Sequence, residues 1–183
     1  LAESWASSVI PVQPSSGFYC PLKAVFQTRL EHFQEELQKI PEFAQTYSLI
    51  VGIAAEIGNN SFDHNLGNWP DIQGIFFGYD LNKRKVALAD RGRGVLATLK
   101  NVRPNLDNHP DALKVAFTEV VTGRAPENRG NGLKWVRIIV ADSKMKLDFR
   151  SGDGEVVVES GFTEPIISLT ESSVRGCLAL IEV

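Results

Sequence analysis

Glu56, Asn60 and His64 recur at every fourth position of a segment with helical periodicity. Residues with this spacing lie along one face of an α-helix. A carboxylate can position or deprotonate an attacking hydroxyl or water, and an amide oxygen is a hard, neutral ligand suited to Mg²⁺. The spacing therefore indicates a base and a metal ligand one helical turn apart. Taken alone, it also fits a solvated helix face without chemistry.

A second group of residues follows the strand-like run from Lys85 to Ala89. Asp90 comes directly after this run and precedes Gly92 and Gly94, which allow positive φ and a close approach of the backbone to a ligand. An aspartate in this position can accept a hydrogen bond from an exocyclic amine such as that of adenine. An ordinary tight turn would have the same composition.

A third group lies at the expected start of a helix, where Gly130, Gly132 and Leu133 occur close together. The start of a helix presents free backbone N–H groups and the positive end of the helix dipole, which together favour phosphate. Arg124 and Arg129 precede this helix and could add positive charge. Both arginines fit equally well on a solvated surface.

The elements that must position these residues follow from apolar periodicity and from Gly and Pro breakers. A breaker-rich lead-in is expected over residues 1–22, and a glycine-containing turn should join the strands that flank Gly152-Asp153-Gly154. Helices are expected over residues 23–40, 42–64, 108–123 and 130–140. Strands are expected over residues 72–80, 85–89, 145–150, 155–159 and 176–183.

The helix expected over residues 23–40 carries one continuous apolar stripe. Its members are Phe26, Leu30, Phe33, Leu37 and Ile40. This stripe predicts a helix packed on the domain core, with a short homodimer seam as the alternative.

Composition limits the function further. The 183 residues have 43% apolar and 22% charged side chains and a net charge of −3, so we expect a globular chain with no membrane span and no broad nucleic-acid surface. Cys20 and Cys177 form no CxxC motif, and a cytoplasmic setting is expected. The sequence contains no GxxxxGK[ST] loop, which excludes a P-loop NTPase.

Together and in this order, the three groups resemble the nucleotide boxes of the GHKL superfamily of ATPases and kinases. Glu56-Ile57-Gly58-Asn59-Asn60 resembles the N box, and Asp90 to Gly94 and Gly130 to Leu133 resemble the two glycine boxes. The resemblance covers about residues 45–182 and implies a two-layer α/β sandwich of the Bergerat type, with a mixed sheet and helices on one face. Residues 1–41 would then form an N-terminal arm and helix, and residues 42–183 the ATP-binding domain.

The resemblance also implies roles for individual residues. Glu56 would be the catalytic base, Asn60 the Mg²⁺ ligand and Asp90 the adenine reader. The glycines of both boxes would shape the pocket and hold the phosphates, with residues 95–129 as an ATP lid. His64 matches a position that is often histidine in the anti-sigma-factor serine kinase branch, whereas His32 lacks the surroundings of a phosphoacceptor histidine and is expected to be an exposed helix residue.

The function implied is that of a Mg²⁺-ATP-dependent ATPase or protein kinase that phosphorylates, or switches its hold on, a bacterial regulatory protein. The alternative is a nucleotide-gated protein-binding module with negligible turnover. A partner-dependent change in ATP turnover would distinguish the kinase from the binding module.

Overall fold

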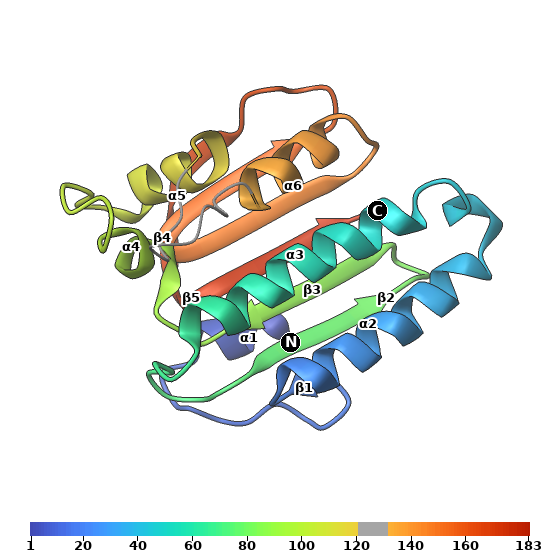
Figure 1. Ribbon diagram of the computed structural model, residues 1–183, viewed down its shortest axis with the longest axis horizontal. Coiled ribbons are helices and arrows are strands. Elements are labelled where there is room, and N and C mark those ends of the chain that lie inside the picture. The colour runs from blue at the N-terminus through green and yellow to red at the C-terminus, as the bar shows by residue number, and fades with distance from the viewer. Residues whose placement is uncertain (121–131) are drawn as a thin grey trace.

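The computed structural model describes residues 1–120 and 132–183. Its helices are α1 (Ala2–Ser7), α2 (Lys23–Gln38), α3 (Tyr47–Asn65), α4 (Gly94–Leu99), α5 (His109–Thr118) and α6 (Gly132–Ala141), with a 3₁₀ turn at Pro41–Phe43. Its strands are β1 (Tyr19–Cys20), β2 (Ile75–Asp80), β3 (Lys85–Asp90), β4 (Lys146–Glu159) and β5 (Ile166–Glu182). The helices expected around the three residue groups are therefore present, together with the β2–β3 hairpin (Figure 1).

The strands form one sheet in the order β1-β2-β3-β5-β4, and every neighbouring pair in the described part of the chain is antiparallel. The expectation of a mixed sheet was wrong. Short turns join β2 to β3 and β4 to β5, and a short turn permits only antiparallel pairing. The register of β3 with β5 places Asp90 opposite Cys177.

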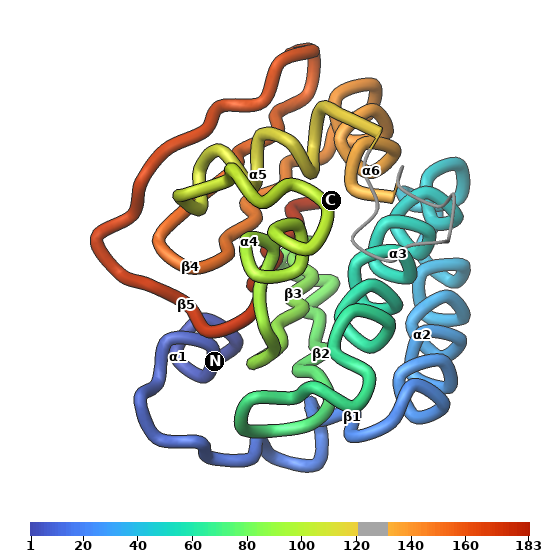
Figure 2. Tube along the Cα trace, turned by 60° about the vertical axis from the view of Figure 1, so that its left-hand side comes forward, coloured from blue at the N-terminus to red at the C-terminus, as the bar shows by residue number. Residues whose placement is uncertain are grey.

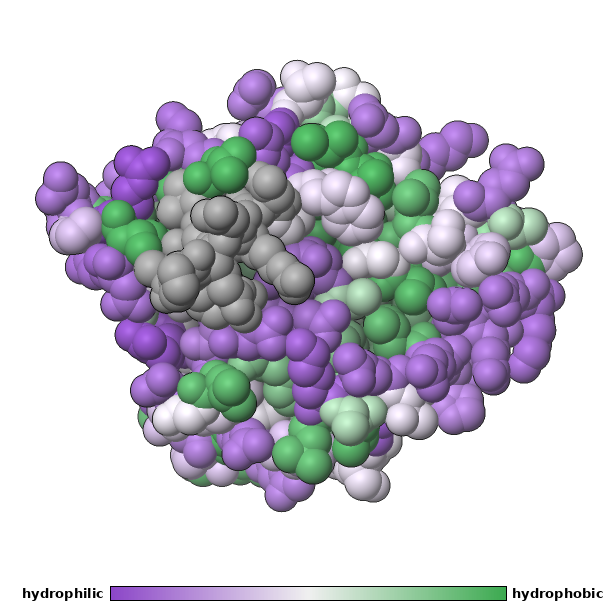
Figure 3. Space-filling model, viewed as in Figure 1, coloured by the Kyte–Doolittle hydropathy of each residue, from purple (hydrophilic) through white to green (hydrophobic). Residues whose placement is uncertain are grey.

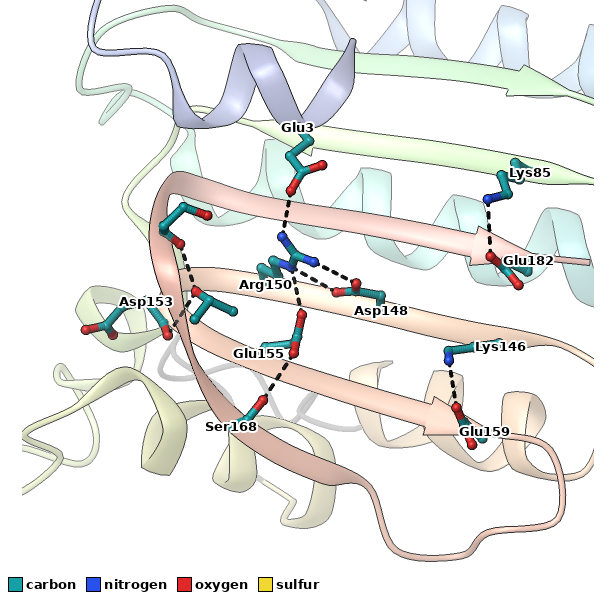
Figure 4. Close-up of polar contacts among 12 residues, drawn as sticks. Glu3, Lys85, Lys146, Asp148, Arg150, Asp153, Glu155, Glu159, Ser168 and Glu182 are labelled. Atoms are coloured by element: carbon teal, nitrogen blue, oxygen red, sulfur yellow. Dashed lines mark hydrogen bonds and ion pairs between the residues drawn. The ribbon is translucent and has the colours of Figure 1, made fainter. Parts of the chain in front are cut away.

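Strand β4 reverses its direction within its own length, as Figure 4 shows. Lys146 Nζ lies 2.6 Å from Glu159 Oε1, although a straight strand would separate residues so far apart in sequence by about 40 Å. Arg150 and Glu155 form a second ion pair at 2.9 Å across the same bend. The turn expected at Gly152-Asp153-Gly154 is thus confirmed, and Gly152 has the positive φ of 62° that it requires.

Helices cover both faces of the sheet. The main core lies between one face and the helices α2, α3, α5 and α6, and it includes Phe77 and Leu88. The short helix α1 packs on the opposite face against Phe76 and Ala89, as the two views in Figures 1 and 2 show. The expectation of helices on one face only was therefore wrong, because neighbouring residues of β2 and β3 present apolar side chains to both sides.

The apolar stripe of α2 is part of the main core. Phe26, Phe33 and Leu37 are fully buried, and Phe33 contacts the rings of Phe77 and Tyr79 on β2. The outer surface of α2 is largely hydrophilic (Figure 3). The burial of this stripe agrees with a helix packed on its own domain.

Candidate functional site

Helix α3 holds Glu56 and Asn60 side by side. The amide nitrogen Nδ2 of Asn60 donates a hydrogen bond to Oε1 of Glu56 at 3.1 Å, and both residues are half-buried. Because the nitrogen makes this bond, the amide oxygen of Asn60 is the atom left to meet a cation or a donor. His64 lies one turn further along α3 and is also half-buried, while His32 on α2 is exposed as expected.

The start of α6 lies directly against these two side chains. A Cβ atom on Gly132 would be 1.8 Å from Oε1 of Glu56 and 3.2 Å from Nδ2 of Asn60, so no larger residue fits while Glu56 keeps this position. The N-terminus of a ten-residue helix therefore meets a carboxylate and an amide from α3. Leu133 is half-buried and packs against the main core, which anchors this helix start.

Asp90 lies on the other flank of α3, at the end of β3. Its side chain is 1% exposed; Oδ2 accepts a hydrogen bond from Ser61 Oγ and Oδ1 accepts one from the Gly92 N–H, both at 2.8 Å. Burial raises the pKa of Asp90 to about 6, and these hydrogen bonds oppose the shift only in part. A hydrogen bond thus joins the Asp90 carboxyl group to Ser61, the residue that follows Asn60 on α3.

The glycines after Asp90 are required by close packing. A Cβ on Gly92 would lie 2.1 Å from Nδ2 of Asn65, and Oδ1 of Asn65 accepts a hydrogen bond from the Arg93 N–H at 2.8 Å. Gly94 has a φ of +74° and begins α4. The loop from Asp90 to Gly94 therefore packs around Asn65, a buried asparagine of α3.

The closing strand β5 completes the surroundings of Asp90. Ser151 Oγ donates a hydrogen bond to the carbonyl oxygen of Gly176 at 2.8 Å and accepts one from the Val95 N–H at 2.9 Å. A Cβ on Gly176 would lie 2.3 Å from Oδ1 of Asp90. The carboxyl group of Asp90 therefore lies between α3, the glycine loop (residues 91–94), Ser151 of β4 and Gly176 of β5.

Ser61, Asn65 and Ser151 contribute to this site and were missed by sequence reasoning. Ser61 and Asn65 are spaced by four residues on the side of α3 that faces the sheet, and this spacing of polar residues at buried positions was the available signal. Ser151 had no comparable signal, because its role depends on the bend in β4.

Several expected site residues lie outside the described residues. These are Arg124, Arg129 and Gly130, together with residues 121–129 of the expected lid. The lid residues within the described range form α4 and α5, which pack on each other and on β4.

A Mg²⁺ ion fits the donor set near Asn60. Mg²⁺ in nucleotide sites uses one or two protein oxygens and takes its other ligands from water and substrate phosphates. The amide oxygen of Asn60 beside the carboxylate of Glu56 meets that requirement. Among residues 1–120 and 132–183 there is no group of three or more His, Cys, Asp or Glu side chains that could hold a metal without a substrate.

Comparisons with known proteins leave the family open. No protein-family model matches the chain, and no curated protein matches it. None of the helices in the described ranges is long and apolar enough to cross a membrane.

Proposed function

We propose that this chain binds Mg²⁺-ATP at the junction of α3, the end of β3 and the start of α6, and that its fold is the Bergerat sandwich of the GHKL superfamily. The observation that carries the proposal is that Gly132 lies against Glu56 and Asn60, while Ser61, the next residue of α3, donates a hydrogen bond to Asp90. Three residue groups that are distant in sequence thus lie around one helix. Independent surface features would have no reason to converge in this way.

Each group has one task in the proposed mechanism. Asp90 accepts a hydrogen bond from the adenine amine, and the helix start at Gly132 faces the phosphates with its free N–H groups. Glu56 orients or deprotonates the attacking hydroxyl or water, while Asn60 provides its amide oxygen to the metal. The Mg²⁺ ion would neutralise charge that develops on the phosphates.

The substrate of the proposed phosphoryl transfer is a regulatory protein or water. Positioning and charge neutralisation account for most of the catalysis in such transfers, so a base, a metal ligand and phosphate-facing amides form a sufficient set. The second candidate is a nucleotide-gated binding module. The half-burial of Glu56 against the start of α6 favours this candidate, because it limits the access of a nucleophile to the carboxylate.

The test is titration calorimetry with ATP and Mg²⁺, combined with an ATP turnover assay. We expect Asn60→Ala to abolish Mg²⁺-dependent binding, and Glu56→Ala to bind normally without turnover. Glu35→Ala, which removes an exposed carboxylate on α2, is the matched control and should behave like the native chain.

Two outcomes would reject parts of the proposal. Normal binding of Mg²⁺-ATP by Asn60→Ala would remove the assigned role of Asn60. Equal, slow ATP turnover in the native chain and in Glu56→Ala would reject the enzyme hypothesis in favour of the binding module.

A further inference from the structure

Arg91 is a fully buried charged residue, and it directly follows Asp90 in the glycine loop. Its guanidinium binds Asp71, with Nε 3.0 Å and Nη2 2.8 Å from Oδ2. The charge is therefore paired away from the proposed phosphate site.

The second half of the guanidinium group binds helix α1. Nη1 of Arg91 donates to the carbonyl oxygen of Trp5 at 2.6 Å and to that of Ser8 at 2.9 Å. These carbonyls lie at the C-terminal end of α1, where helices leave carbonyl groups without intrahelical partners and favour positive charge. The guanidinium also lies 5.8 Å from the centre of the Trp5 ring.

Helix α1 depends on contacts with the rest of the chain for its order. Six residues are too few for a helix to be stable by itself. Its buried side chains, Ala2, Trp5 and Ala6, pack on the sheet face opposite α3, and Glu3 forms an ion pair with Arg150 at 2.7 Å (Figure 4). Arg91 is thus a major polar anchor of α1 to the rest of the chain.

The same residue sets the backbone around Asp90. Arg91 lies between Asp90 and Gly92, and the Gly92 N–H donates to Oδ1 of Asp90 at 2.8 Å. A shift of the guanidinium would therefore move the backbone that orients this carboxyl group. Because both carboxyl oxygens of Asp90 already accept hydrogen bonds, from Ser61 and from the Gly92 N–H, a small displacement changes which of them can accept a further donor.

We propose that Arg91 is a positioning residue that couples the docking of α1 to nucleotide binding at Asp90. The inference rests on the proposed function, because it assigns an N-terminal control to the same site. When α1 is docked, Arg91 fixes the glycine loop in the form that binds ATP; when α1 leaves, Arg91 loses two of its acceptors and the loop shifts. Thermodynamic linkage makes the effect reciprocal, so bound ATP must also stabilise docked α1.

Neighbouring residues of α1 provide a matched test. Ala6 is fully buried against the sheet and Ser7 is exposed, so Ala6→Asp undocks α1 whereas Ser7→Asp adds the same charge without undocking it. We expect Ala6→Asp to raise the Kd for Mg²⁺-ATP about tenfold and Ser7→Asp to leave it unchanged. Arg91→Lys, which retains the charge but not the planar fork, should also raise the Kd.

The reciprocal measurement uses the native chain. Hydrogen exchange at the amides of residues 5–8 should slow about tenfold when Mg²⁺-ATP saturates the site, in proportion to the change in Kd. A purely structural role for Arg91 would not produce this response to nucleotide.

The outcomes separate the two proposals. If the native chain binds no ATP, both the proposed function and this inference fail. If the native chain binds ATP but Ala6→Asp, in folded form, binds it equally well, only the coupling fails. If Ala6→Asp does not fold, hydrogen exchange in the native chain decides between the outcomes. Equal exchange rates at the amides of residues 5–8 with and without Mg²⁺-ATP would overturn the coupling.

Discussion

Replacing Gly132 with alanine adds a single methyl group at the contact between α6 and α3. That Cβ would lie 1.8 Å from Oε1 and 2.7 Å from Cδ of Glu56. To restore ordinary contact, the carboxylate must move by roughly 1.5 Å. The atoms in conflict are the far end of a flexible side chain, so the chain can fold with Glu56 displaced.

The expected effect on stability is therefore small and the effect on catalysis large. Gly132 is the first residue of α6, so only part of the roughly 1 kcal/mol by which alanine is favoured over glycine in a helix interior applies there. Because the flexible Glu56 side chain can rotate away, the free energy of unfolding should stay within about 1–2 kcal/mol of the native value. A catalytic group displaced by about 1 Å can lose about 100-fold in rate, and we expect a loss of this size in ATP turnover. ATP affinity should change less, because Asp90 is untouched.

The assays are urea unfolding, calorimetry with Mg²⁺-ATP and steady-state ATP turnover. Gly17→Ala is the control, since a Cβ on Gly17 would meet nothing within 4 Å. Native turnover in Gly132→Ala would refute the reasoning, because it would mean that the observed position of Glu56 has no catalytic importance.

Three further predictions concern stability and pH. Burial raises the pKa of Asp90 to about 6, so the folded chain retains a proton that the unfolded chain releases above about pH 4. The free energy of unfolding should therefore fall as the pH rises from about 4 to about 6. Asp90→Asn should flatten this slope in urea titrations. Ser151→Ala leaves the Val95 N–H and the Gly176 carbonyl without their shared partner and should cost about 1–3 kcal/mol in the same assay, whereas an unchanged midpoint would contradict the contact. Phe33→Ala should cost about 3–5 kcal/mol because Phe33 is fully buried, and a cost under 1 kcal/mol would mean that α2 is not part of the core.

Local signals in the sequence located α2, α3, α5, α6 and the β2–β3 hairpin, but not α1 or α4. The helix expected from residue 108 is present as α5, and Asn108 caps it by accepting a hydrogen bond from the Asp111 N–H at 2.8 Å. The bend at Gly152-Asp153-Gly154 was also recognisable from its glycines. These features depend on residues close together in the chain, and sequence patterns report such interactions directly.

Long-range interactions were harder to predict. Helix α1 is too short to show periodicity, and it is ordered by contacts with strands 70 to 170 residues away, including Phe76 and Leu178. Arginine is rarely buried, so no sequence pattern predicted that Arg91 lies inside the molecule. Its partner Asp71 is 20 residues earlier, and only the folded chain brings the two together.

The most direct test of the central claim is a crystal structure of the chain with Mg²⁺ and a non-hydrolysable ATP analogue. The proposed site requires the adenine amine within hydrogen-bonding distance of the Asp90 carboxylate, the metal at the amide oxygen of Asn60 and the phosphates at the start of α6. A nucleotide bound elsewhere, or one that touches Asp90 without approaching Asn60 and Gly132, would contradict the account.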